Sequence, residues 1–191
     1  MISNLLASVL AAATLHASNP MAQPNQTQTQ TQTQTQTQTC QKTCQVTDAL
    51  INLISQFEGY SPFTYDDSGG RRTIGYGHLI TANEQIPEPL LPVDAAGLLR
   101  SDLLPKASFV NASVKRPLYP SQFNALVSFT YNVGTGSLKR STLLKKVNAH
   151  ADRDVPNQFL KWDTANGKQI SGLRVRRRTE ANLYASVLGT E

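Results

Sequence analysis

Apolar residues between positions 47 and 58 recur with the period of an α-helix. They are Leu50, Leu53, Ile54 and Phe57. Their spacing of i, i+3, i+4 and i+7 places them on one helical face. Thr47 or Asp48 can cap the first turn, and Gly59 can end the helix because glycine adopts the left-handed conformation at no steric cost. Glu58 is therefore expected in the last turn, where the helix dipole disfavours its ionised form.

The pattern changes after Gly59. From Phe63 to Leu79, extended segments with alternating side chains flank a turn-forming run of Asp, Ser and Gly, which predicts a small antiparallel hairpin or meander. Helical spacing then returns in five segments separated by Gly, Pro and Asn. These are Val93–Leu104, Ser121–Tyr131, Ser141–Asn148, Val155–Trp162 and Leu173–Leu188. The predicted fold class is α+β, with a small sheet lobe, a larger helical lobe and a cleft between them.

The first 45 residues have a different composition. An apolar run from Leu5 to Leu15 is too short for a membrane span but suits the core of an export signal, so residues 1–22 are read as a signal. The alternative is a disordered segment without a targeting role. Residues 23–45 form a spacer that contains an unbroken Gln-Thr repeat, and such a tract lacks the apolar surface needed to fold. One folded domain is expected over residues 46–191.

Both cysteines, Cys40 and Cys44, lie where the spacer meets the folded domain. An even count and a possible export signal favour a local disulfide, which requires an oxidising compartment. The sequence leaves paired and free cysteines equally open. Two cysteines without a nearby histidine do not make a zinc site.

A formal net charge of +5 adds a preference for anionic partners, such as nucleic acid, acidic lipid or an anionic wall polymer. Charge alone does not choose among them. The choice depends on chemistry elsewhere in the chain.

Three residues, one at the end of the first helix and two in the predicted hairpin, carry that chemistry. Glu58 at a helix end, with aromatic neighbours, suits a proton donor. Asp67, in a polar Gly-rich turn, is expected to stay ionised, and Thr73 offers a hydroxyl that can orient a water molecule. Two carboxyl groups in contrasting environments together with a held water are the groups that glycoside hydrolysis requires.

These residues also match a known pattern. The spacing Glu, eight residues, Asp, five residues, Thr resembles that of the phage-type lysozymes or endolysins of glycoside hydrolase family 24. The surrounding letters agree, in EGY, YDDSGG and TIGYGHLIT, and the similarity continues through QFNALVSFTYNVG, STLLKKVN, FLKWDTANGK and GLRVRRRTEANLY. It covers about residues 48 to 188.

The resemblance implies a lysozyme-like fold and muramidase activity, which cleaves the β-1,4 bond between N-acetylmuramic acid and N-acetylglucosamine in peptidoglycan. It implies that Glu58 protonates the leaving oxygen, and that Asp67 and Thr73 handle the attacking water. It implies no metal or organic cofactor. Two alternatives stay open: a lytic transglycosylase on the same substrate, and a non-catalytic basic domain that binds the wall or nucleic acid. Retention of Glu58, Asp67 and Thr73 favours hydrolysis.

The resemblance assigns further positions by analogy. His78 is expected to form a structural ion pair with Asp102, while Leu79 and Asn132 fall in segments that line the family's sugar cleft. One arginine among positions 174 and 176–178 is expected near Glu58, where its charge would oppose the effect of the helix dipole on proton affinity. Arg174 is taken as a substrate-binding residue. Trp162 is expected in the core and Asp66 in a turn.

The expected partner is the glycan strand of bacterial peptidoglycan, without nucleic acid or a stable membrane span, and the chain is expected to be a monomer. A genuine export signal would place the enzyme outside the cell or in the periplasm. Without one, it would lie in the host cytoplasm. The sequence identifies neither a phage nor a bacterial origin.

Overall fold

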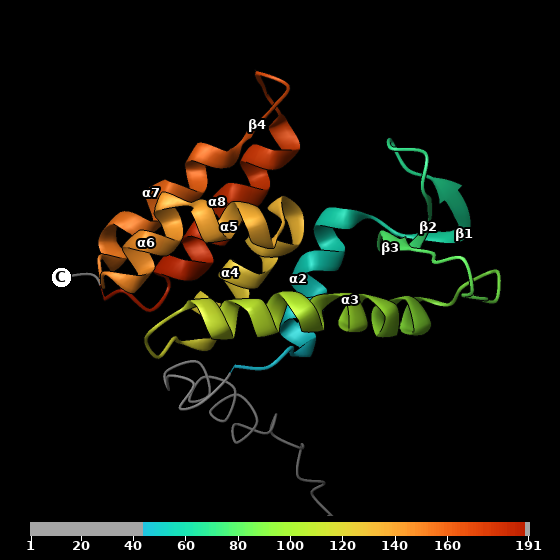
Figure 1. The fold of residues 1–191 in the computed structure, drawn as a ribbon, viewed down its shortest axis with the longest axis horizontal. Helices are drawn as coiled ribbons and strands as arrows, with labels where there is room; N and C mark the ends of the chain where they lie inside the picture. Colours follow the sequence, from blue (N-terminus) through green and yellow to red (C-terminus); the bar gives the residue numbers. More distant parts are fainter. Residues whose placement is uncertain (1–43, 190–191) are drawn as a thin grey trace, which may run out of the picture.

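The computed structural model describes residues 44–189, which form a helical body with a small sheet at one side (Figure 1). The helices are α2 (Asp48–Glu58), α3 (Pro92–Ser113), α4 (Pro120–Val133), α5 (Thr135–Arg140), α6 (Thr142–Asn148), α7 (Val155–Phe159) and α8 (Ser171–Ala185). The strands are β1 (Ser61–Asp66), β2 (Arg72–Gly75), β3 (His78–Leu79), β4 (Thr164–Ala165) and β5 (Lys168–Gln169), and the 3₁₀ turns are η1 (Asp152–Asp154) and η2 (Leu160–Trp162). The predicted α+β class is confirmed.

The three strands that follow α2 form an antiparallel sheet in the order β1-β2-β3, as the predicted meander requires. In its register, Tyr65 lies opposite Thr73, and Thr73 lies opposite Leu79. These three residues therefore form one row across the sheet, because residues directly opposite each other share a face.

Helix α3 is longer than predicted. The sequence suggested an end at Leu104, before Pro105, but the helix continues to Ser113 with Pro105 inside it. A proline removes one backbone hydrogen bond and normally disfavours a helix interior. Here Ala107 and Val110 are buried, so core packing continues beyond the proline and outweighs the local cost.

Helix α4 is the centre of the helical lobe and packs against α3 and α8. Nearly all of its side chains from Ser121 to Thr130 are buried. Phe129 meets Phe159 and Trp162 in edge-to-face contacts, with ring centroids 5.4 and 5.3 Å apart. Trp162 therefore packs against the core, as predicted.

A second, smaller apolar cluster joins the sheet to the start of α3. It consists of Ile74, Leu90 and Ala95. Gly75 has a φ of +65°, and a Cβ atom there would lie 3.1 Å from Leu90 and 3.2 Å from Ala95. Only glycine allows both this backbone conformation and this close contact, so Gly75 fixes how β2 lies on the helix.

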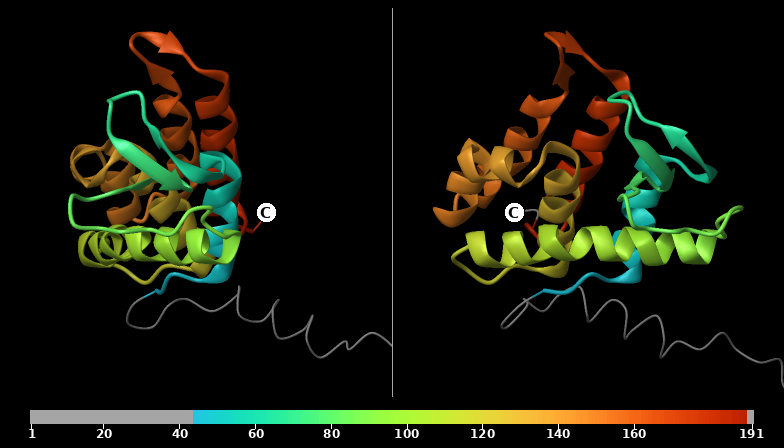
Figure 2. Two further views of the ribbon diagram at one scale, coloured as in Figure 1. Left: turned by 90° about the vertical axis from the view of Figure 1, so that its right-hand side faces the viewer. Right: turned by 45° about the vertical axis from the view of Figure 1, so that its right-hand side comes forward.

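Two features were not predicted. Helix α5 is short and begins directly after α4, and the β4–β5 hairpin projects from the helical lobe (Figures 1 and 2). The hairpin turn holds Asn166 and Gly167 with φ of 50° and 74°. The segment Val155–Trp162, predicted as one helix, is divided into α7 and η2.

The predicted export signal, the Gln-Thr spacer and Cys40 lie outside the described residues. Cys44, the first described residue, is buried and disulfide-bonded. Among residues 44–189, no helix has both the length and the apolar character needed to cross a membrane.

Candidate active site

Glu58 is the last residue of α2, as predicted. The Thr47 side chain caps the helix start, and Gly59 ends the helix with a φ of 72°. The Glu58 side chain is 22% exposed. Within the described chain, its Oε1 atom accepts a hydrogen bond and its Oε2 atom has no hydrogen-bond partner. One carboxyl oxygen is thus held, and the other is available to carry a proton.

Arg176 is the arginine that contacts Glu58. Its Nη1 atom donates to Oε1 of Glu58 over 2.5 Å, and its guanidinium lies 4.9 Å from the ring centroid of Phe57. The same side chain donates to Oε1 of Glu180 and to the carbonyl of Ser128. Arg176 is almost completely buried. Its hydrogen bonds to Glu180 on α8 and to Ser128 on α4 fix the position of its guanidinium group.

Glu180 is a fully buried acid between two arginines. It accepts a hydrogen bond of 2.7 Å from the Ser128 hydroxyl, and its Oε2 lies 3.2 Å from Nη1 of Arg177. Burial raises the pKa of Glu180, although Arg177, Ser128 and Arg176 oppose the shift. Burial likewise lowers the pKa of Arg177 to about 10. The sequence interpretation missed Glu180, although its i+4 spacing from Arg176 is typical of a helical ion pair.

Asp67 lies in the turn between β1 and β2. Its Oδ1 accepts from the amides of Gly69 and Arg71, and its Oδ2 accepts from Nε and Nη2 of the Arg71 side chain at 2.9 and 2.7 Å. Hydrogen bonding to the Arg71 guanidinium, followed by the Arg71 amide, lowers the pKa of Asp67 to about 2. The carboxylate is therefore ionised, as expected, and Arg71 is a partner that the sequence interpretation did not identify.

Thr73 is buried on β2, with Tyr65 on one side and Leu79 on the other. Its hydroxyl donates to the carbonyl of Arg71 over 2.9 Å. A hydroxyl oxygen that donates its one proton keeps lone pairs that can accept from water. Thr73 and Asp67 are both hydrogen-bonded to Arg71, Thr73 to its carbonyl and Asp67 to its amide and guanidinium groups.

The predicted ion pair between His78 and Asp102 is present. Nδ1 of His78 lies 3.0 Å from Oδ2 of Asp102, while Nε2 lies 3.1 Å from Oε1 of Glu84, an acid not predicted to take part. Burial lowers the pKa of His78, but the two carboxylates together outweigh burial and the net direction is upward. The pair connects β3 to α3 and supports the sheet beside Thr73, which favours the structural role over a catalytic one.

The three residues expected to bind substrate lie in different surroundings. Leu79 is 43% exposed beside Thr73, and Asn132 is exposed but its Oδ1 accepts from Nη2 of Arg177 over 2.6 Å. Arg174 contacts Gln169 and lies 3.8 Å from Asp163, at the β4–β5 hairpin. Asp66 is exposed at the end of β1 and pairs with Arg72 in the sheet register.

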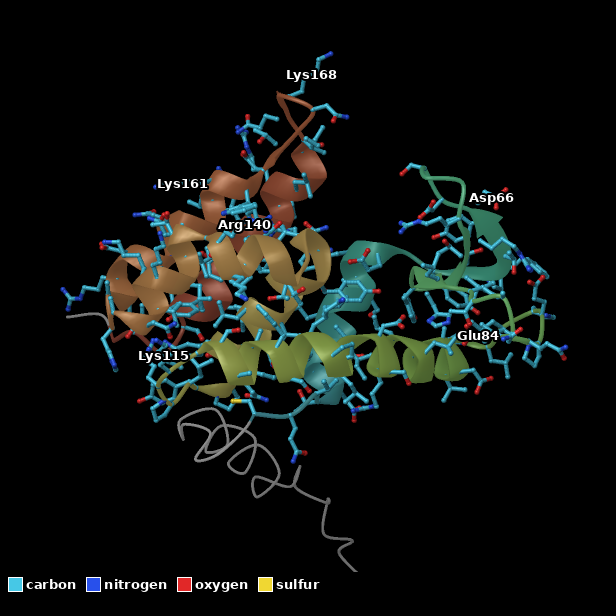
Figure 3. The ribbon with its side chains drawn as sticks, in the orientation of Figure 1. Asp66, Glu84, Lys115, Arg140, Lys161 and Lys168 are labelled. Carbon is cyan, nitrogen blue, oxygen red and sulfur yellow. The ribbon has the colours of Figure 1, made fainter. Side chains whose placement is uncertain are left out.

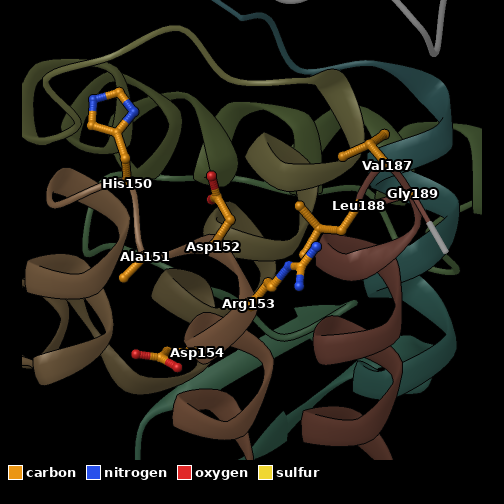
Figure 4. Close-up of a pocket in the computed structure, with 8 residues that line it drawn as sticks. All are labelled: His150, Ala151, Asp152, Arg153, Asp154, Val187, Leu188 and Gly189. Carbon is orange, nitrogen blue, oxygen red and sulfur yellow. The ribbon is translucent and has the colours of Figure 1, made fainter. Parts of the chain in front are cut away.

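A cavity of about 530 Å³ lies at another part of the helical lobe, beside the C-terminal end of α8 (Figure 4). Its wall includes His150, Asp152, Asp154 and Leu188, and none of the predicted site residues. Asp152 in this wall pairs with Arg116 and accepts from the hydroxyl of Tyr184, so it has a structural role. Within residues 44–189, no group of three or more His, Cys, Asp or Glu could hold a metal ion.

Glu58, Asp67 and Thr73 have the chemical groups that acid-assisted cleavage of a glycosidic bond requires. Glu58 offers one unbound carboxyl oxygen, Asp67 is an ionised carboxylate, and Thr73 provides a hydroxyl. These are the groups that a glycosidase uses to protonate a leaving oxygen, stabilise positive charge at the anomeric carbon and orient water.

Comparisons with known proteins agree with this chemistry. Residues 55–180 match the family model described as phage lysozyme. The endolysin of Bacillus phage B103 is 40% identical over 142 residues, which cover 73% of this chain and 53% of that protein. The endolysin of Acyrthosiphon pisum secondary endosymbiont phage 1 is 36% identical over 138 residues, which cover 70% of this chain and 93% of that protein. The chain thus spans about half of the first relative and nearly all of the second.

Among solved structures, the muramidase domain of SpmX from Asticaccaulis excentricus has a TM-score of 0.68 and 34% sequence identity. The match covers 74% of this chain and 97% of that domain. Together with the family model, it places the helical lobe, the sheet and α2 in one shared fold. The chain belongs to the phage lysozyme family.

Proposed function

We infer that this chain is a peptidoglycan muramidase, which hydrolyses the β-1,4 bond between N-acetylmuramic acid and N-acetylglucosamine and so causes lysis of the bacterial wall. Membership of the phage lysozyme family supports the activity. The observation that carries the site assignment is Glu58 at the end of α2, held by Arg176 through one carboxyl oxygen and unbound at the other.

In the proposed reaction, Oε2 of Glu58 gives its proton to the glycosidic oxygen as the bond from that oxygen to the anomeric carbon breaks. A water molecule that donates a hydrogen bond to the Thr73 hydroxyl oxygen attacks the anomeric carbon from the opposite side. The water loses its proton to Asp67, and the sugar leaves with inverted configuration. This geometry requires about 6.5–9.5 Å between the two carboxyl groups, so that the water fits between them.

Asp67 is a weak base in this arrangement, because Arg71 lowers its pKa to about 2. A weak base suffices if the water becomes acidic only as it bonds to a carbon with strong positive charge. The main contribution of Asp67 is then its fixed negative charge, which stabilises an oxocarbenium-like transition state. Arg71 positions Asp67 and keeps it ionised.

A lytic transglycosylase would use the acid alone and form an anhydro-sugar without consuming water. The buried Thr73 hydroxyl and the arginine-bound Asp67 support the hydrolytic reaction, since a transglycosylase needs neither. A wall-binding domain without activity would need none of the three residues.

Product analysis tests the proposal. Purified peptidoglycan is digested with the wild-type protein, and the products are examined for reducing ends and by mass spectrometry. Hydrolysis predicts new reducing ends and products heavier by one water than the anhydro form. Anhydro-sugars would instead establish transglycosylation, and undigested glycan would show that the protein binds the wall without cleaving it.

We further propose that the protein is exported and acts as a monomer outside the cytoplasm. The disulfide-bonded state of Cys44 supports export, because disulfides persist in oxidising compartments. The apolar run from Leu5 to Leu15 would serve as the signal. N-terminal sequencing of the exported protein tests this: a start near residue 23 is expected, and an intact Met1 on protein retained in the cytoplasm would contradict it.

A further inference from the structure

The charges of the folded domain are divided unequally along the chain. Residues 44–113, which form α2, the three-stranded sheet and α3, hold four Lys and Arg against eight Asp and Glu, a net charge of −4. Residues 114–189, which form the rest of the helical lobe, hold thirteen Lys and Arg against four Asp and Glu, a net charge of +9. The overall net charge of +5 therefore combines an acidic first part of the domain with a strongly basic second part.

Part of this positive charge is neutralised internally. Arg116 pairs with Asp152, Lys146 with Asp154, and Arg176 with Glu58 and Glu180. Other cations are exposed and form no ion pair with an acid of the described chain. They are Lys115, Lys139, Arg140, Lys145, Lys161, Lys168 and Arg178. These side chains are available to an external anion.

Three of these exposed cations gather where the β4–β5 hairpin meets α8, together with Arg174, which is exposed and lies 3.8 Å from Asp163. Lys161 is on η2 and Lys168 is at the hairpin tip (Figure 3). Arg174 and Arg178 occupy successive turns of α8. We call these four residues the hairpin patch. A pocket of about 180 Å³ lies within it, lined by Arg174, Arg178, the buried Arg177, Leu160 and Asp163. Three arginines and one acid give this pocket a positive potential.

We propose that the hairpin patch binds the phosphodiester groups of an anionic polymer of the bacterial cell wall, separately from the glycan that is cleaved at Glu58. The pocket has room for a phosphate-sized group, and guanidinium groups bind phosphate oxygens through paired hydrogen bonds. A chain of evenly spaced phosphates could continue from the pocket onto Lys161 and Lys168. Its negative charges would be attracted to residues 114–189, which have a net charge of +9, and repelled by residues 44–113, which have a net charge of −4.

Two other polyanions fit the patch less well. Single-stranded nucleic acid is held by exposed aromatic side chains on which bases stack, whereas Trp162, the aromatic residue near the hairpin, packs against Phe129. An anionic lipid surface would need an apolar face to enter the bilayer. Leu160, Ile170 and Val175 are exposed here, but Leu160 belongs to η2, Ile170 precedes α8 and Val175 lies within α8, so they do not form the continuous apolar face of one helix.

Two triple variants with equal net charge test the proposal. The patch variant carries Lys161→Glu, Lys168→Glu and Arg178→Glu. The matched variant carries Lys115→Glu, Lys139→Glu and Lys145→Glu, three exposed lysines outside the patch, with Lys115 at the opposite end of the lobe (Figure 3). Binding of soluble poly(glycerol phosphate) is measured by titration calorimetry at low and physiological salt, after circular dichroism has shown that both variants are folded.

The patch variant should bind at least about tenfold more weakly than wild type and show a shallower salt dependence, since it loses specific phosphate contacts. The matched variant should lose less than about threefold. Equal losses in both variants, or no binding by the wild-type protein, would overturn the proposal. Hydrolysis of a short uncharged oligosaccharide should be unchanged in the patch variant, so the result is independent of whether Glu58 is the catalytic acid.

A lipid surface is tested in the same experiment. The substitutions Ile170→Gln and Val175→Gln are compared with Leu91→Gln and Val93→Gln, two exposed apolar residues near the start of α3. Polymer binding should be unaffected by either pair. The proposal is overturned in favour of a lipid site if phosphatidylglycerol vesicles bind more tightly than the polymer and only the Ile170→Gln and Val175→Gln pair abolishes that binding.

Discussion

Arg176 and Glu58 are 118 residues apart in the sequence and 2.5 Å apart in the fold, with Nη1 of the arginine donating to Oε1 of the acid. Arg176 is held in turn by Glu180 and by the Ser128 carbonyl. The orientation of the proposed acid at the end of α2 therefore depends on a buried ion pair in α8. Stability and activity should be coupled at this position.

Replacing Arg176 by Gln should destabilise the fold by about 3–5 kcal/mol, because it leaves the buried Glu180 without one of its arginine partners. Lytic activity should also fall, since Glu58 loses the contact that orients it. Urea unfolding and a lysis assay measure the two effects. The control is Arg178→Gln, an exposed arginine on the same helix, which should change stability by less than about 0.5 kcal/mol. Equal effects of the two substitutions would show that the Arg176 contacts are unimportant.

The acid limb of the pH–activity profile should depend on Arg71. In the wild-type protein, the pKa of Asp67 is about 2, so Asp67 stays ionised throughout the mildly acidic range. In Arg71→Gln, the pKa should rise towards the ordinary value of 3.8, and activity should begin to fall at higher pH on the acid side. Activity near pH 7 should change much less, because Asp67 is ionised there in both proteins. An unchanged acid limb would mean that ionisation of Asp67 does not control the rate.

His78 should contribute stability at low rather than high pH. Its pKa is raised in the folded protein, so the contribution is fully present below the ordinary value of 6.5 and is lost as pH rises through the folded value. His78→Gln should therefore cost on the order of 1–2 kcal/mol near pH 6 and clearly less near pH 9. Urea unfolding at the two pH values measures this difference. A cost that is the same at both would show that the charged contacts with Asp102 and Glu84 are not responsible.

The Thr73 hydroxyl should matter more for catalysis than for stability, to which its hydrogen bond with the Arg71 carbonyl contributes about 1 kcal/mol. Thr73→Val preserves the shape of a buried side chain but removes the atom proposed to hold water, and it should lower kcat roughly 10–100-fold. Thr73→Ser retains the hydroxyl and should lose less than about tenfold. Steady-state kinetics on soluble glycan oligomers compare the two. If the serine and valine variants were equally impaired, packing rather than the hydroxyl would explain the loss.

Much of this fold follows from local sequence patterns. The helical period up to Phe57, Gly59 after it and the Asp-Ser-Gly turn predict α2 and the meander, because each depends on residues close together in the chain. The Asn166-Gly167 pair is also a strong hairpin signal, and the sequence interpretation missed the β4–β5 hairpin by not using it. Helix α5 has a weaker signal, since six residues that include Gly136 show little periodicity.

The site was predictable only in part. Glu58, Asp67 and Thr73 were predicted as site residues from their spacing, but the residues that hold their side chains in the structure were not. Arg71 is four residues from Asp67, and only the folded turn shows that its guanidinium binds the carboxylate. Arg176 could not be distinguished from its neighbouring arginines by type, because the side of α8 that faces α2 depends on packing between distant helices.

The role of Glu58 as the acid is tested most directly by Glu58→Gln. Glutamine keeps the length of the side chain and an oxygen that can accept from Arg176, but it has no proton to donate. The rate at which the variant clears a suspension of purified cell walls should fall by roughly 10²–10⁴-fold or more, with circular dichroism and unfolding unchanged. A folded Glu58→Gln variant that clears the suspension at the wild-type rate would contradict the account.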